Sequence, residues 1–129
     1  MATVYVLDGT RIRTLDDFWR VVMDAFDGPG RQYFGGNFAA FADCLSGGPG
    51  HPDVDEYIVE WRDHDVSRVH LGYPETVRRL ERDRTRCHPS IRTAVAAYLA
   101  EARGRRGPSV FDQLVEVFER CAPGVLRLQ

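Results

Sequence analysis

The sequence predicts an α/β fold, in which a small three-stranded parallel sheet is packed with helices. Three short apolar segments, at residues 3–7, 57–61 and 125–128, have the length and composition of buried strands. Stretches with helical periodicity separate them, and parallel neighbours need such long crossover connections. The chain has 129 residues, of which 43% are hydrophobic, so we expect residues 1–129 to form one domain around a single core.

A helix is predicted directly after the first strand. Asp8-Gly9 marks a turn. Thr14 is a suitable N-cap, because its hydroxyl can accept a hydrogen bond from an amide of the first turn. Apolar side chains then recur at helical spacing until Gly28-Pro29-Gly30 ends the pattern. They are Leu15, Phe18, Val22 and Phe26.

A second, shorter helix follows an aromatic, glycine-containing loop. Asn37 is its predicted N-cap. Its apolar stripe consists of Phe38, Phe41 and Leu45. Asp43 falls off this stripe, among small side chains. The face could be a docking surface or a solvated helix face, and spacing alone favours the solvated face.

Further helices are predicted after the second strand. One helical turn is expected at 67–71, and Pro74 begins a short amphipathic helix that His88-Pro89 ends. Residues 90–102 have high helix propensity. The predicted inner face of this segment consists of Ile91, Val95, Tyr98 and Ala102. Pro108 is predicted to begin the last helix. Its predicted inward residues are Phe111, Leu114, Val115 and Phe118.

Charge is unevenly distributed along the chain. All 17 basic residues are arginines, and the net charge is −2. Residues 73–106 hold nine arginines and four acids, giving +5, whereas the remainder holds eight arginines and 15 acids, giving −7. The acidic remainder suits a basic partner, because complementary fields accelerate association. The same sign argues against direct nucleic-acid binding by that part.

The sequence lacks the patterns typical of membrane insertion, metal binding or cofactor binding. It has no 18-residue apolar run and no export signal, so we expect a cytoplasmic protein without membrane contact. Cys44, Cys87 and Cys121 are odd in number and lack metal-type spacing, which suits reduced thiols. The four histidines lack a zinc-type pairing, and no nucleotide-binding glycine loop is present. We therefore expect neither a metal nor a cofactor.

Two residue groups could indicate an enzyme. Asp63-His64-Asp65 could be a general base with orienting carboxylates, and Cys87-His88 could be a nucleophile with its base. Neither pattern is specific. Adjacent side chains point in different directions, and the first group is typical of a polar turn after a strand. We expect no catalytic residues.

Four short motifs follow one another in a recognisable order. Residues 4–9 read as strand and turn, 33–45 as a tyrosine-aromatic-glycine loop entering a helix, and 59–62 as a strand ending in glutamate-tryptophan-arginine. Residues 111–128 read as a last helix and strand. In this order the motifs resemble the barstar family of intracellular ribonuclease inhibitors. Relative to that family, the two predicted helices at about 73–106 are an insertion.

The resemblance implies a function for the loop and the second helix. In the family this surface plugs the active site of a nuclease. Carried over residue by residue, Asp43 would take the place of a substrate phosphate, and Tyr33 would lie against the catalytic histidine of the nuclease. Asn37 would cap the helix. Gly35 and Gly47 would let the backbone approach the partner closely.

The chain departs from the family pattern around this carboxylate. Ala39 stands where the family has an aspartate, and Ala42 stands where it has a tryptophan. The acidic contact of the last helix aligns with Arg120, although Glu116 and Glu119 are close by. The nuclease would then carry different complementary groups, or bind more weakly.

Two charged groups outside this surface are further candidates. The acidic contact could have moved to a longer loop that holds Asp53, Asp55 and Glu56. A second contact area, or a solvated surface, is formed by Arg84, Arg86, Arg105 and Arg106.

The sequence therefore predicts a non-enzymatic immunity protein. It would inhibit a basic, guanyl-type ribonuclease that the same cell secretes, as a monomer in a 1:1 complex. The alternative is a regulatory or scaffold protein that keeps this fold and binds a partner other than a nuclease.

Overall fold

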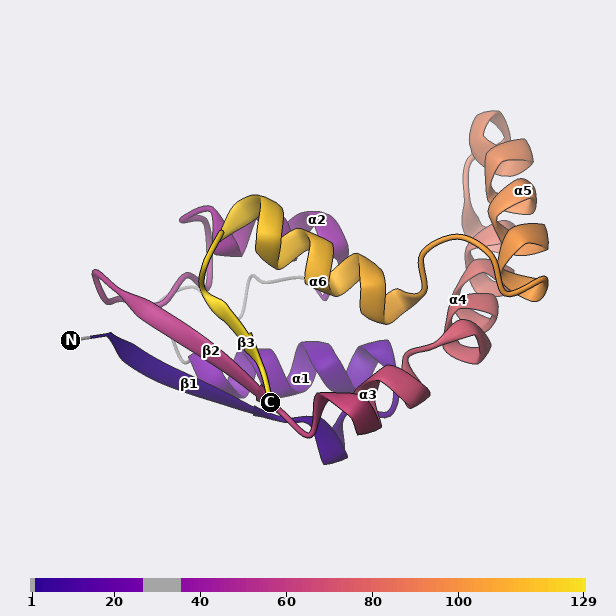
Figure 1. Ribbon diagram of the computed structural model, residues 1–129. Coiled ribbons are helices and arrows are strands. Elements are labelled where there is room, and N and C mark those ends of the chain that lie inside the picture. The colour runs from indigo at the N-terminus through magenta and orange to yellow at the C-terminus, as the bar shows by residue number, and fades with distance from the viewer. Residues whose placement is uncertain (1, 27–35) are drawn as a thin grey trace.

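The computed structural model describes residues 2–26 and 36–129, and it contains the predicted three-stranded parallel sheet (Figure 1). β1 (Thr3–Asp8) pairs with β2 (Tyr57–Arg62), which in turn pairs with β3 (Leu126–Leu128). The sheet order is thus β1-β2-β3, and β2 is the central strand.

The described residues also form six α-helices and two short 3-10 helices. The α-helices are α1 (Leu15–Phe26), α2 (Phe38–Leu45), α3 (His64–His70), α4 (Tyr73–Arg86), α5 (Arg92–Arg103) and α6 (Val110–Cys121). The 3-10 helices are η1 (Gly9–Arg11) and η3 (Pro89–Ile91). Within the ranges 2–26 and 36–129, none of these helices has the length and apolar character needed to cross a membrane.

An aromatic cluster joins the central strand to three helices. Trp61 of β2 is fully buried, and its ring centroid lies 5.1 Å from that of Phe18 in α1. Phe18 contacts Phe41 of α2 at 5.4 Å, and Phe41 contacts Phe118 of α6 at 5.1 Å, both edge to face. Such contacts add to the free energy of burial and fix ring orientation. The cluster therefore holds α2 against α1 and α6.

Trp61 and the neighbouring Ser67 satisfy their buried polar atoms with hydrogen bonds. The Trp61 indole donates to the Ser67 hydroxyl at 3.0 Å, and Ser67 donates to the Gly9 carbonyl at 2.9 Å. A side chain at Gly9 would collide with the Arg62 carbonyl, because its Cβ would lie 2.3 Å from that oxygen. Glycine at this position thus allows η1 to approach the end of β2.

The first turn of α4 caps two other helices. Glu75 is buried, and its Oε2 accepts a hydrogen bond of 2.7 Å from the amide of Leu15, the first residue of α1. The hydroxyl of Thr76 accepts a hydrogen bond of 2.9 Å from the amide of Val110, the first residue of α6. Amides at helix starts lack partners within their own helix. The beginning of α4 is therefore part of the core architecture.

The inner face predicted for α5 is wrong in part. Ile91 and Tyr98 were expected to face inward, but they are 51% and 59% exposed. Ala102 is buried as predicted and Val95 is half-buried, whereas Leu99, which was not predicted to face inward, is buried. The reason is that α5 packs mainly against α4 in a hairpin that stands away from the sheet (Figure 1), so only a narrow strip of α5 is covered.

The predicted start of the last helix is also displaced. α6 begins at Val110 and not at Pro108, because Ser109 is its N-cap. The Ser109 hydroxyl accepts from the Asp112 amide at 3.2 Å, and the Asp112 carboxylate accepts from the Ser109 amide at 3.0 Å. This reciprocal capping box fixes where the helix starts.

Candidate protein-binding surface on α2

α2 is fixed at both ends by hydrogen bonds. At its start the Asn37 side chain accepts a hydrogen bond of 2.8 Å from the Ala40 amide, which confirms the predicted N-cap. At its end Gly47 has φ +104°, a conformation that favours glycine. The Gly48 amide then donates to the Asp43 carbonyl at 2.6 Å. The helix is short, but its free amides and carbonyls are partly satisfied at each end.

The inner face of α2 is anchored in the core. Phe41, Cys44 and Leu45 are buried. Phe38 is partly buried, and its ring lies 5.5 Å from the Trp19 ring of α1. The predicted apolar stripe is therefore confirmed, with Cys44 added to it. Burial raises the pKa of the Cys44 thiol to about 11, so this cysteine stays protonated at neutral pH.

The outer face of α2 presents one carboxylate among small side chains. Asp43 and Ala39 are exposed, and Ala42 is half-buried. In the described part of the chain, the Asp43 carboxylate accepts no hydrogen bond and forms no ion pair. Asp43 also lies in the last turn of α2, where the helix dipole disfavours a negative charge. Among the described residues its carboxylate thus has no partner, and the charge does not stabilise its own helix.

The turn after α2 explains why position 48 lacks a side chain. A Cβ at Gly48 would lie 2.7 Å from the Asp43 carbonyl oxygen and 3.0 Å from the carbonyl carbon. These backbone atoms cannot move without opening the turn. A larger side chain therefore has no room at position 48 in the present turn geometry.

The three candidates on α6 are exposed, and none of them pairs with Asp43 in the described part of the chain. Glu116 and Arg120 form an exposed i,i+4 ion pair at 3.6 Å. Glu119 lines a hollow of about 210 Å³ beside Leu126 and Leu128 of β3. No hydrogen bond or ion pair in the described ranges joins Asp43 to any of these three side chains. Tyr33 and Gly35, which complete the predicted surface, lie outside the described residues.

The acidic loop between α2 and β2 offers a second group of exposed carboxylates. Asp53, Asp55 and Glu56 are all exposed. Asp55 and Glu56 line an open hollow beside Thr3, at the start of β1. This loop therefore remains an alternative candidate for the acidic contact with a partner.

The enzyme candidates have structural roles. His64 donates from Nδ1 to the Gln129 carbonyl at 2.8 Å, and its ring stacks on Phe111. His88 caps η3, since its Nδ1 accepts a hydrogen bond of 3.1 Å from the Ser90 amide. The Cys87 thiol points to the Arg84 carbonyl at 3.7 Å, so it does not address His88. Ranges 2–26 and 36–129 contain no cluster of three metal-ligating side chains.

Sequence reasoning missed the capping residues Glu75, Thr76 and Ser109. The serine had a readable signal, because Ser109 precedes an acidic residue by three positions, as in a capping box. Glu75 and Thr76 had none, because their partners lie 60 and 34 positions away along the chain.

Comparison with known proteins assigns the chain to a protein family. The family model described as Barstar (barnase inhibitor) matches residues 2–86, from β1 to the last residue of α4. No match was found among curated proteins. The matched region contains the sheet's first two strands, α2 with its capped ends, and the capping turn of α4. The chain therefore belongs to the barstar family.

Proposed function

We propose that this protein inhibits a basic ribonuclease by laying α2 over the nuclease active site. The observation that carries the proposal is the Asp43 carboxylate, which is exposed and unpaired in the described structure and sits on a helix fixed at both ends. The family consists of ribonuclease-binding inhibitors, which supports a protein partner of this kind.

The chemistry follows from what a ribonuclease active site must bind. Such a site holds a phosphate with cationic side chains, and a carboxylate can replace that phosphate through charge-assisted hydrogen bonds. Because α2 packs through its Phe41 on Phe118 of α6 and is capped by Asn37, little conformational entropy is lost when it binds. Asp43 would supply the charge, and the small side chains at 39 and 42 would let the partner approach closely.

The charge distribution supports a basic partner. The chain outside residues 73–106 carries a net charge of −7, which attracts a cationic protein at long range. In this proposal the protein is a non-enzymatic monomer that protects the cytoplasm against a ribonuclease secreted by the same cell, in a 1:1 complex without RNA.

A cleavage assay tests the proposal. RNA hydrolysis by a panel of guanyl-type ribonucleases, including those of the source cell, is measured with and without an equimolar amount of this protein. We expect complete inhibition of at least one enzyme of the source cell. Undiminished hydrolysis across the whole panel would contradict the proposal.

One observation favours a second candidate. Ala39 and Ala42 leave Asp43 without the neighbouring charged and aromatic contacts of the family. A regulatory or scaffold protein that binds a non-nuclease partner would also fit this plainer surface. Affinity purification from the source cell separates the two, since the retained protein either degrades RNA or does not.

A further inference from the structure

α5 carries more apolar surface than its neighbours cover. It packs mainly against α4, in the hairpin that stands away from the sheet (Figure 1). The covered stripe of α5 consists of Val95, Leu99 and Ala102. Ile91, the N-cap residue of α5, and Tyr98 are exposed large apolar side chains beside this stripe. An exposed apolar surface rimmed by polar residues is typical of a site that binds another protein.

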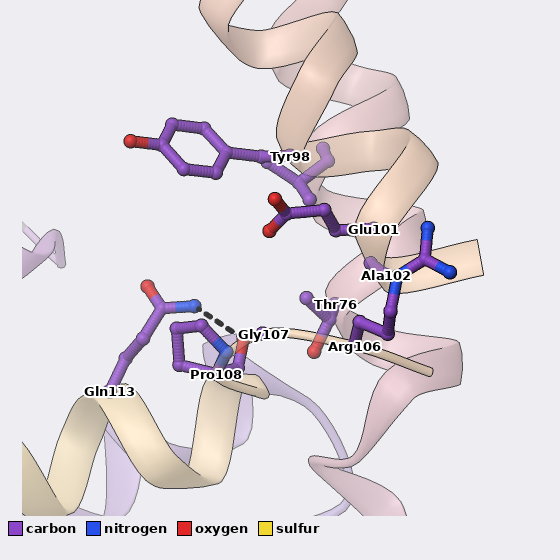
Figure 2. Close-up of a pocket in the computed structure, with 9 residues that line it drawn as sticks. Thr76, Tyr98, Glu101, Ala102, Arg106, Gly107, Pro108 and Gln113 are labelled. Atoms are coloured by element: carbon purple, nitrogen blue, oxygen red, sulfur yellow. Dashed lines mark hydrogen bonds between the residues drawn. The ribbon is translucent and has the colours of Figure 1, made fainter. Parts of the chain in front are cut away.

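The exposed apolar side chains of α5 form one line. Ile91, Ala94 and Tyr98 have the spacing i, i+3 and i+7, so they lie on one face of the helix, and all three are exposed. We name these three residues the α5 stripe. The stripe extends over about 10 Å of the helix axis. Figure 2 shows Tyr98 projecting from α5 on the side of Gln113 in α6, so the stripe lies on the side of α5 that is turned toward the start of α6.

A mainly apolar hollow continues the α5 stripe at its Tyr98 end. The hollow has a volume of about 260 Å³, and its apolar wall includes Tyr98, Leu80, Ala102 and Pro108. This volume is below the roughly 300–1,000 Å³ of pockets for drug-sized ligands, so it suits a single side chain. Glu101 also lines the hollow, but it is exposed and can turn its carboxylate to water. Protein interfaces are often anchored by one large side chain in such a hollow.

The hairpin around the α5 stripe has an excess of unpaired positive charge. Three of the nine arginines in residues 73–106 form ion pairs in the described part of the chain. The other six form no ion pair there, and they are Arg82, Arg84, Arg86, Arg92, Arg105 and Arg106. Arg92 follows Ile91 at one end of the stripe, and Arg106 lines the hollow at the other end. This charge favours a partner with acidic side chains.

We propose that the α5 stripe binds an amphipathic helix of a partner protein, in which acidic residues flank the apolar face. The apolar face of that helix packs along the stripe, where the small side chain of Ala94 allows two helices to approach closely. One large apolar side chain of the partner fills the hollow. Acidic side chains near the two ends of the partner helix pair with Arg92 and Arg106.

The same observations argue against other occupants of the α5 stripe. A second copy of the chain is disfavoured, because two hairpins that each carry +5 repel one another. The basic ribonuclease proposed for α2 is disfavoured for the same reason. Single-stranded RNA would need aromatic surfaces on which its bases stack, and Tyr98 is the one aromatic residue of the three in the stripe.

Peptide binding to the full chain tests the proposal without a nuclease, so its outcome is independent of the role proposed for Asp43. The test peptide is a labelled, stapled helix with leucines at i, i+3 and i+7 and flanking glutamates. One control peptide replaces the glutamates by lysines, another replaces the leucines by serines, and a single-stranded RNA represents a polyanion without an apolar face. By fluorescence anisotropy we expect the test peptide to bind at least about tenfold more tightly than each control. Equal binding of any control, or no binding of the test peptide, would overturn the proposal.

Matched variants assign the binding to the α5 stripe. Tyr98→Ala should weaken binding of the test peptide at least about tenfold. Arg92→Gln should weaken it roughly two- to fivefold, because it removes an exposed charge pair. Val69→Ala is the control, since Val69 is also an exposed apolar side chain but lies on α3. The fold of each variant is checked by circular dichroism. Equal affinity of Tyr98→Ala and Val69→Ala would refute the site, as would a loss of peptide binding in Asp43→Asn.

Discussion

Glu75 allows the sharpest prediction about stability, because one buried carboxylate connects α4 to α1. Its side chain is 4% exposed. Oε2 accepts the Leu15 amide at 2.7 Å, and the carboxylate receives two hydrogen bonds from Arg78, at 2.5 and 2.8 Å. Glu75→Ala removes all of these and leaves the Leu15 amide buried without an acceptor.

The expected loss has two parts. A buried amide without a partner costs about 1–3 kcal/mol. The Arg78 side chain is 49% exposed, so its ion pair with Glu75 is screened by solvent and adds no more than about 1 kcal/mol. We expect Glu75→Ala to lower the free energy of unfolding by about 2–3 kcal/mol, which corresponds to a fall in Tm of roughly 8–12 °C. Glu75→Gln keeps an acceptor and should lose about half as much.

Urea unfolding followed by circular dichroism provides the measurement. Glu81→Ala is the control, because it removes a carboxylate of α4 whose ion pair with Arg103 is half-exposed on both sides. It should cost less than about 1 kcal/mol. If Glu75→Ala were no more destabilising than Glu81→Ala, the capping role assigned to Glu75 would be refuted.

The same carboxylate makes stability depend on pH. Burial alone would raise the pKa of Glu75, but the hydrogen bonds from Arg78 and from the Leu15 amide outweigh it, and the pKa is lowered. A carboxylate whose pKa is lower in the folded than in the unfolded chain stabilises the fold fully at pH values above its unfolded-state pKa. This stabilisation disappears as the pH falls through the folded-state pKa. The difference in unfolding free energy between the wild type and Glu75→Gln should therefore shrink on acidification.

The remaining predictions concern α2 and its surroundings. Gly48→Ala should destabilise the protein by about 1–3 kcal/mol in thermal unfolding, because its Cβ would lie 2.7 Å from the Asp43 carbonyl oxygen; an unchanged Tm would show that the turn rearranges freely. Cys44 should resist a thiol reagent at pH 8 in the native protein, since burial raises its pKa to about 11. The half-buried Cys87 and Cys121 should react first, and mass spectrometry showing early labelling of Cys44 would contradict its burial.

The elements with local signals were predictable from the sequence. Thr14 and Asn37 were predicted to cap the starts of α1 and α2, and both do. The Thr14 hydroxyl accepts a hydrogen bond of 3.1 Å from the Asp17 amide, and the Asn37 side chain accepts one from the Ala40 amide. Asp43 was predicted to lie off the apolar stripe, and it is exposed. In each case the signal and its partner lie within a few residues of one another.

The parts that failed depend on distant contacts. Periodicity shows that a helix has an apolar face, but it does not show how much of that face will be covered. Tyr98 is exposed for this reason, whereas the neighbouring Leu99 on α5 is buried. The burial of Glu75 could not be predicted from the sequence. The Leu15 amide that hydrogen-bonds its buried carboxylate lies 60 positions earlier in the chain.

We propose that the Asp43 carboxylate serves binding to a partner and not the stability of its own fold. The most direct measurement compares the wild type with Asp43→Asn, recording both the inhibition constant against the cognate ribonuclease and the free energy of unfolding. Losing one charge-assisted contact should weaken inhibition roughly 10- to 100-fold. Stability should stay the same or rise by about 0.3–1 kcal/mol, because a charge at the unfavourable end of α2 is removed. Asp55→Asn is the matched control, and it should inhibit like the wild type. Unchanged inhibition by Asp43→Asn, together with a severe loss in Asp55→Asn, would contradict the account and place the contact in the acidic loop.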